Sequence, residues 1–314
     1  MLTADEIIEA VRNKTDEGDE FDITDDHILA SVNRGLVSGY NIIAQVYPDP
    51  LMKSADITLT TQGEVSIPTD VFQDRVLNVE LLIGDTPYAL EAINHNSIHR
   101  YDSGSTSSNP NAWAQVGRKI KLYSPASVGT TVRVWYVEKP QKVVKSQGRI
   151  TRLGADYFVV DTYGGGLTSD SDELNSYFNI IDFNSGAVKW SSQVKTITGN
   201  QITHKAVATR SLVLNQTISV DQSEATEAIR QDDYICAAEG SCVPYLPIII
   251  ENYCIQHAVV DILDRLNIDS SMARATLSHF DKQLRKQWSG RTETTKLSLT
   301  TNQWKGSRGR YRSW

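Results

Sequence analysis

The sequence predicts an α+β protein, in which a helical bundle is built from both ends of the chain and antiparallel β-domains are inserted between those ends. Apolar residues recur at helical spacing near both ends, whereas between them they alternate with polar residues as in half-buried strands. We therefore expect five segments: N-terminal helices of the bundle at 1–54, a β-domain at 55–140, an inserted second β-domain at 141–235, a C-terminal helical hairpin completing the bundle at 236–288, and an extended basic arm at 289–314.

The N-terminal segment predicts two helices. Thr3 and Glu6 have the spacing of a capping box, which begins a short helix that runs through Val11. Residues 14–26 form an acidic loop that contains Thr24, the expected cap of a long helix. Carboxylates stabilise the positive N-terminal end of a helix, which explains this loop better than a metal site does. The apolar stripe of the long helix consists of Ile28, Val32, Leu36, Tyr40, Ile43 and Tyr47.

From residue 55 the apolar period becomes two, which indicates strands. In the first β-domain the strands are expected at 56–60, 64–68, 76–81, 119–123 and 131–136. In the second they are expected at 156–161, 177–183, 187–190, 194–198, 201–207 and 218–221. Asn184-Ser185-Gly186 and Gly199-Asn200 are typical of hairpin turns, and the Ser/Gly/Asn-rich residues 102–112 predict a loop.

The C-terminal hairpin is predicted from two apolar stripes separated by Asn267 and Asp269. The first stripe is Ile248, Ile255, Val259, Ile262 and Leu266, and the second is Ala273, Leu277, Phe280, Leu284 and Trp288. The face opposite the first stripe carries His257, Asp261, Asp264 and Arg265. Beside the first stripe, Ile250, Cys254 and Ala258 form a second apolar patch, which we expect to contact a neighbouring subunit because a helix with two apolar faces packs against two surfaces.

Charge is distributed unevenly along the chain. Residues 289–314 hold six of the 31 basic residues and one of the 38 acidic residues, so the arm is +5 and the remaining body is −12. A basic arm on an acidic body indicates a partner surface or nucleic acid as the arm's ligand. The alternative is a solvated, frayed terminus.

No catalytic signature accompanies these features. The sequence has no nucleophile elbow, His-Glu-x-x-His motif, dinucleotide fingerprint or Cys-x-x-Cys pair, and Gly164-Gly165-Gly166 is a turn without the residues of a phosphate loop. His95 and His99 lack a third ligand, and Asp170, Asp172 and Glu173 lack the spacing of a calcium loop. We therefore expect no enzyme activity, no metal and no cofactor.

Signals for secretion, disulfides and membrane insertion are also missing. No basic start is followed by an apolar run, and three cysteines form no disulfide framework. The longest apolar stretch, 246–266, contains Glu251, His257, Asp261 and Asp264. We expect synthesis in a reducing compartment, with no signal peptide and no membrane association.

The order of these segments resembles the head-to-tail adaptor (connector) proteins of tailed bacteriophages. The resemblance rests on the strand lead-in Ile67-Pro68-Thr69-Asp70-Val71 with the following strand at 76–82, on the strand pair at 120–125 and 132–140, and on the entry to the hairpin at 233–235 and 243–247 with its end at 284–288. These segments span about two-thirds of the chain, and the unit at 141–232 departs from the shortest members of the family.

The resemblance implies a structural protein of the virion that forms a ring of twelve copies below the portal, extends the DNA channel and provides the platform for a downstream tail or nozzle protein. Genomic DNA would pass without sequence-specific contacts, and assembly would occur in the host cytoplasm. Residues 289–314 would then be an extension that grips the portal. Its expected contact residues are Arg291, Lys296, Leu297, Leu299, Trp304, Lys305, Arg308, Arg310, Tyr311, Arg312 and Trp314.

Two alternatives remain open from the sequence. The chain could be another tail or baseplate protein whose inserted β-domain binds host glycan through Trp190 and neighbouring tyrosines. It could also be a nucleic-acid-binding protein that uses its basic arm, although the acidic body disfavours this as the main function.

Overall fold

The fold is described from a computed structural model, which divides into two compact units: residues 1–43 with 141–314, and residues 44–140. The described residues are 2–16, 23–84, 86–94, 110–123, 126–154, 156–169, 176–186, 188–205, 209–211, 216–218, 228–238, 240–243 and 248–287.

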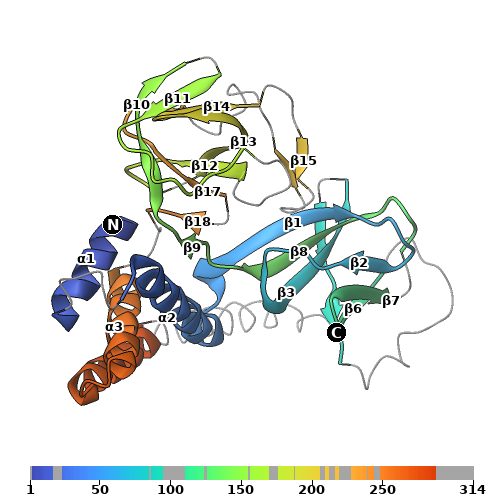
Figure 1. The fold of residues 1–314 in the computed structure, drawn as a ribbon. Helices are drawn as coiled ribbons and strands as arrows, with labels where there is room; N and C mark the ends of the chain where they lie inside the picture. Colours follow the sequence, from blue (N-terminus) through green and yellow to red (C-terminus); the bar gives the residue numbers. More distant parts are fainter. Residues whose placement is uncertain are drawn as a thin grey trace, which may run out of the picture. The chain divides into compact units, whose positions relative to one another are not determined.

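Helices make up one part of the first unit (Figure 1). They are α1 (Ala4–Thr15), α2 (Asp25–Val46, which extends past the unit's boundary), α3 (Ile248–Arg265) and a further helical stretch at 271–287. The predicted capping box is confirmed, since Glu6 N donates to Thr3 Oγ1 at 3.2 Å and Thr3 N donates to Glu6 Oε2 at 2.7 Å. Helix α1 continues four residues beyond the predicted end because Thr15 is buried and its hydroxyl donates back to Val11 O at 3.1 Å.

Helix α3 lies between the other helices of this unit. Leu2 N, just before α1, donates to Glu251, and Ser38 Oγ of α2 hydrogen-bonds to Tyr253 Oη at 2.9 Å. On another side, Gln256 Nε2 donates to Ala273 O at 3.1 Å. These contacts lie on several sides of α3, which explains why apolar residues occur around most of its circumference. On the predicted polar face, His257 and Asp261 are half-buried, whereas Asp264 and Arg265 are exposed.

A closed antiparallel barrel forms the other part of the first unit. In spatial order it consists of β10 (Ser146–Leu153), β11 (Tyr157–Val160), β14 (Gln201–His204), β13 (Val188–Thr198), β12 (Tyr177–Ile181) and β17 (Tyr234–Ala237). Both predicted hairpins are confirmed, with Gly186 and Gly199 at positive φ. The strands predicted at 187–190 and 194–198 are one strand, β13, and a register shift between Val194 and Thr196 interrupts the alternation that predicted two.

Strand β10 was not predicted from the sequence. Its burial does not alternate regularly, and Gly148 at φ 126° lies where the pairing with β17 shifts register. Two short pairs complete the unit: β9 (Lys142–Val143) runs parallel to β18 (Gly240–Ser241), and β15 (Thr209–Ser211) pairs with β16 (Gln216–Ile218). The barrel core contains Phe158, Phe178 and Trp190, whose rings meet edge to face with centroids 6.0–6.2 Å apart.

The second unit consists of two four-stranded sheets around one apolar core. One sheet has the order β1 (Met52–Thr58), β8 (Thr131–Glu138), β3 (Val71–Ile83) and β4 (Thr86–Ala89), and the other has β2 (Glu64–Ser66), β7 (Lys119–Tyr123), β6 (Ala112–Val116) and β5 (Glu91–Ala92). A 3-10 helix, Asp49–Leu51, precedes β1. All five strands predicted here are present, and β6 begins at the last residue of the expected loop.

The predicted mixed α+β class is thus confirmed. The complete bundle and the hairpin ending at Trp288 remain predictions, because residues 288–314 lie outside the described part of the chain. Within the described ranges, no helix combines the length and the apolar character needed to cross a lipid bilayer.

Candidate functional site

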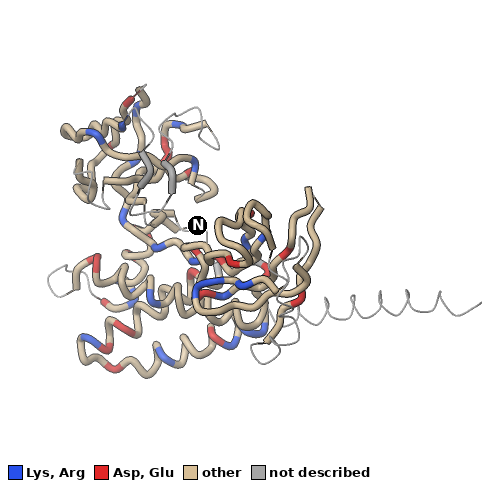
Figure 2. Tube along the Cα trace, turned by 90° about the vertical axis from the view of Figure 1, so that its right-hand side faces the viewer, with Lys and Arg blue, Asp and Glu red and all other residues tan. Residues whose placement is uncertain are grey.

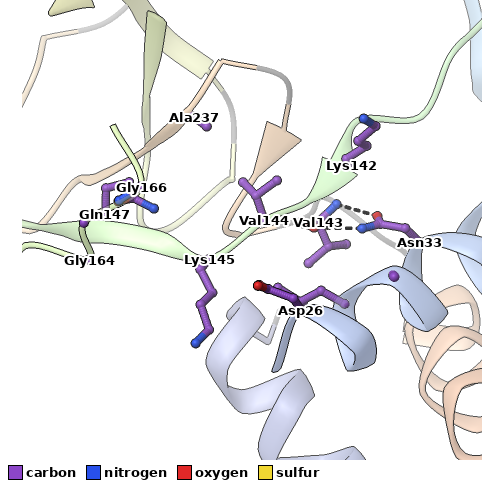
Figure 3. Close-up of a pocket in the computed structure, with 13 residues that line it drawn as sticks. Asp26, Asn33, Lys142, Val143, Val144, Lys145, Gln147, Gly164, Gly166 and Ala237 are labelled. Carbon is purple, nitrogen blue, oxygen red and sulfur yellow. Dashed lines mark hydrogen bonds between the residues drawn. The ribbon is translucent and has the colours of Figure 1, made fainter. Parts of the chain in front are cut away.

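A groove of about 690 Å³ lies in the first unit between α2 and the start of the barrel (Figure 3). Its apolar lining comes from Leu29, Val143, Val144 and Ala237. Charged and polar groups from α2 and from the segment at 142–147 line it as well: Asp26, Asn33, Lys142, Lys145 and Gln147. The groove combines an apolar lining with a few polar groups, as binding sites do.

The carboxamide of Asn33 attaches α2 to strand β9. Asn33 Nδ2 donates to Val143 O at 2.9 Å, and Val143 N donates to Asn33 Oδ1 at 2.7 Å (Figure 3). One side chain therefore satisfies both backbone groups of a residue that is 1% exposed. Since β18 pairs on the other side of β9, Asn33 takes the place of a neighbouring strand.

A second polar contact shapes the opposite wall of the groove. Gly166 N donates to Gln147 Oε1 at 2.6 Å. A Cβ on Gly164 would lie 2.8 Å from the backbone oxygen of Ser146, and Gly165 has φ 76°, so glycine is favoured at both positions. The glycine run at 164–166, which the sequence identifies as a turn, thus combines a close backbone approach with a left-handed conformation.

Three charged residues form an ion-pair network beside the groove. Asp25 accepts from Arg12 Nη2 at 2.7 Å and from Lys145 Nζ at 2.5 Å. Partial burial of Asp25 would raise its pKa, but the hydrogen bonds and charges of Lys145 and Arg12 outweigh that effect and lower it. Asp25 in turn raises the pKa of Lys145. The network joins α1 and α2 to Lys145, which lies just before β10. Figure 2 shows the basic and acidic residues along the chain in blue and red.

The barrel contains a more deeply buried charge cluster. Lys189 Nζ contacts Asp182 Oδ1 at 2.6 Å and the two oxygens of Asp233 at 2.9 and 3.0 Å, and the Lys189 side chain is 1% exposed. Asp182 also accepts from Ser185 N and Oγ, both at 2.8 Å, and Asp233 accepts from Arg230 N at 2.7 Å. Every carboxylate is therefore hydrogen-bonded, which is the condition for tolerating charge in a barrel interior.

The chemistry of these residues suits binding and structural support. Among the described residues, no group of three His, Cys, Asp or Glu side chains is placed to hold a metal ion. His257 lies half-buried against α2, where a Cβ on Gly35 would approach its Cβ to 2.9 Å, and this burial lowers its pKa. His95, His99 and the Asp170–Glu173 loop lie outside the described residues.

The residues predicted to contact a neighbouring subunit lie inside their own chain. Ile250, Cys254 and Ala258 are at most 2% exposed. A Cβ on Gly35 would lie 3.1 Å from Cys254 Cα, and one on Gly39 would lie 3.7 Å from Ile250 Cγ2, so α2 covers this patch. The second apolar face of α3 is thus explained by packing within the chain, which gives no support to a role in subunit contact.

Two further sequence predictions can be located. All eleven arm residues predicted to bind the portal, from Arg291 to Trp314, lie outside the described residues. Trp190, the residue suggested for glycan stacking, is 4% exposed and packs in the barrel core. It therefore presents no ring face on which a sugar could stack.

Sequence reasoning missed the residues that form the groove and the buried cluster. Asp182 had a local signal, since it precedes the predicted turn Asn184-Ser185-Gly186 and hydrogen-bonds to it. Asn33 had none, because its partner Val143 is 110 residues away. For Lys189 the second carboxylate, Asp233, is 44 residues away, so the cluster could not be assembled from neighbouring residues.

One family model, described as SU10 adaptor protein, matches residues 2–162. The matched region is slightly more than half of the chain and includes α1, α2, the second unit and strands β9 to β11. No curated protein matches the chain.

Proposed function

The chain belongs to the SU10 adaptor protein family, and from this premise we propose that it is a head-to-tail adaptor of a tailed bacteriophage. In this proposal it forms a twelve-subunit ring below the portal, extends the DNA channel and carries the attachment platform for a tail or nozzle protein. The family match over residues 2–162 is the observation that supports the proposal.

The contacts in the first unit suit a protein that must withstand mechanical force. Asn33 and the Arg12–Asp25–Lys145 network tie the helices to the segment that enters the barrel. These contacts connect residues that are far apart in the sequence, so they resist separation of helices and barrel. A platform that transmits force between head and tail needs such connections, and we assign no catalytic step to them.

The test is assembly of the full-length chain on its portal. Purified portal rings are mixed with the adaptor, and the mixture is examined by negative-stain electron microscopy and mass photometry. We expect a collar on one end of the portal with a mass gain of twelve subunits. A chain that stays monomeric and does not bind portal would contradict the proposal.

We further propose that residues 289–314 bind the portal, because the arm is +5 and carries Trp304, Tyr311 and Trp314. Deletion of 289–314 should then abolish portal docking. If the arm instead serves DNA, the deletion should leave docking intact and abolish retention of duplex DNA at low salt.

The acidic body suits a channel through which DNA slides. Residues 1–288 carry a net charge of −12, and a wall that repels phosphates avoids the counterion release that holds DNA on basic proteins. Reversal of several body carboxylates to lysine should slow DNA ejection from assembled particles. An unchanged ejection rate would contradict the proposal that the acidic charge helps DNA to slide through the channel.

A further inference from the structure

Helix α1 and the helical stretch 271–287 contact α3 on different sides of its axis. Leu2, at the start of α1, contacts Glu251, whereas Ala273 of the stretch 271–287 contacts Gln256. These two α3 positions are five residues apart, and at 3.6 residues per turn they point about 140° apart around the helix axis. The outer faces of α1 and of 271–287 are therefore two separate surfaces of the same unit.

The outer face of α1 is acidic. Ile7, Ile8 and Val11 are buried on its inner side, while Asp5, Glu6 and Glu9 are exposed; we call these three residues the acidic face. The Glu6 carboxylate is engaged in the capping box. Glu9 makes no ion pair with any described residue, so its charge is available to a partner.

The outer face of 271–287 is basic. Arg274, Lys282, Arg285 and Lys286 are all exposed, and we call them the basic face. Arg274 and Arg285 pair with Asp264 and Asp281, but both pairs are open to solvent. The four basic residues and these two acids give the surface a formal net charge of +2, which suits an acidic partner surface.

The inner stripe of this helix is incompletely covered by its own chain. Leu284 is fully buried, but Leu277 and Phe280 are only half-buried. Met272, at the start of the helix, is 83% exposed, and Ile268 in the preceding turn is 49% exposed. Apolar side chains thus lie next to the basic face, so the surface combines charge with apolar area that a partner could bury.

We propose that the acidic face of one copy binds the basic face of the next copy. The two faces differ and belong to the same subunit, so the contact is head-to-tail, and head-to-tail contacts produce a ring when the rotation closes. This inference rests on the proposed ring function and assigns the surfaces that build it. Opposite charges set the orientation of the contact, and the half-buried apolar residues add buried area.

A charge-swap experiment tests this assignment. Variant A carries Asp5→Lys and Glu9→Lys, and variant B carries Lys282→Glu and Lys286→Glu. In variant A both faces are basic and in variant B both are acidic, so neither should form rings on the portal by itself. A 1:1 mixture restores opposite charges at every contact and should recover rings in which the two variants alternate.

The readout is the ring mass by mass photometry together with composition by native mass spectrometry. A matched control, Arg152→Glu with Lys195→Glu, reverses two exposed basic residues of the barrel and should assemble like the wild type. Circular dichroism melts check that each variant is folded. If folded A and B each form rings, or if their mixture does not, the assignment of these faces is wrong. Absence of rings from the wild type on its portal would reject the proposed function itself and this inference with it.

Discussion

The barrel of the first unit and the β1–β8 strand pair of the second unit both hold ion pairs, but in different surroundings. In the barrel, Lys189 of β13 pairs with Asp182 and Asp233, which lie just outside β12 and β17. Lys189 and Asp233 are at most 1% exposed. Arg133 and Asp56 lie across from one another in the register of β8 and β1 and pair at 2.7 Å, yet their side chains are 32% and 47% exposed. Distances are similar in the two regions, but Lys189 is buried and contacts two carboxylates, whereas Arg133 is partly exposed and contacts one.

Burial changes what each pair contributes. An exposed pair exchanges water for a partner at little net gain, whereas a buried pair leaves an uncompensated charge when one partner is removed. The comparison therefore predicts large effects in the barrel and small effects at the β1–β8 pair, although the contacts look alike.

The largest effect is expected for Lys189→Met. The substitution leaves Asp182 and Asp233 facing each other without a counter-ion, and loss of one partner from a buried charge cluster costs about 3–5 kcal/mol. Urea unfolding followed by tryptophan fluorescence measures the free energy of unfolding. The matched control adds Asp182→Asn and Asp233→Asn to the same protein, which removes the unpaired charge and should recover part of the loss. A loss below about 1 kcal/mol for Lys189→Met would show that burial does not govern this cluster.

The next effect is expected for Asn33→Ala, which tests a neutral buried contact. Both backbone groups of Val143 lose their partner, so the free energy of unfolding should fall by about 2 kcal/mol. Asn33→Asp is the comparison variant: its carboxylate still accepts from Val143 N, but it no longer donates to Val143 O and places a negative charge beside that oxygen. A loss well below about 1 kcal/mol for Asn33→Ala would contradict the role assigned to this contact.

The pH dependence of stability should follow the charge of Asp182. The hydrogen bond from Lys189, helped by those from Ser185, holds the pKa of Asp182 well below its ordinary value despite partial burial. A carboxyl with a lowered folded pKa stabilises the protein above its unfolded pKa, and this contribution is lost as the pH falls below about 4. The stability difference between the wild type and Asp182→Asn should therefore shrink on acidification from neutral pH. A difference that is independent of pH would contradict the ionised state of Asp182.

The smallest effect is expected for Arg133→Met in strand β8 of the second unit. The pKa of Asp56 is lowered mainly by its hydrogen bond from Arg133, so the pair is formed, but water replaces the partner readily at this exposure. Differential scanning calorimetry should show no resolved change in the unfolding transition. A loss comparable to that of Lys189→Met would show that the two regions do not differ as burial predicts.

By itself, the sequence determined the elements with strong local signals. Thr3 and Glu6 cap α1, Gly186 and Gly199 turn the chain between β12, β13 and β14, and the alternating residues of β7 and β8 form strands, because each depends on neighbours within a few residues. The order of these segments was also sufficient to indicate the adaptor resemblance, which agrees with the family match.

Only the tertiary structure decided which elements meet. It closed six strands into a barrel, and it placed Lys189 between Asp182 and Asp233. It joined Asn33 to Val143, covered Ile250 and Cys254 with α2, and buried Ala258. These outcomes depend on contacts between residues that are tens to hundreds of positions apart. A helical stripe shows that a face is apolar, but the partner that covers it is set by the packing of the whole unit.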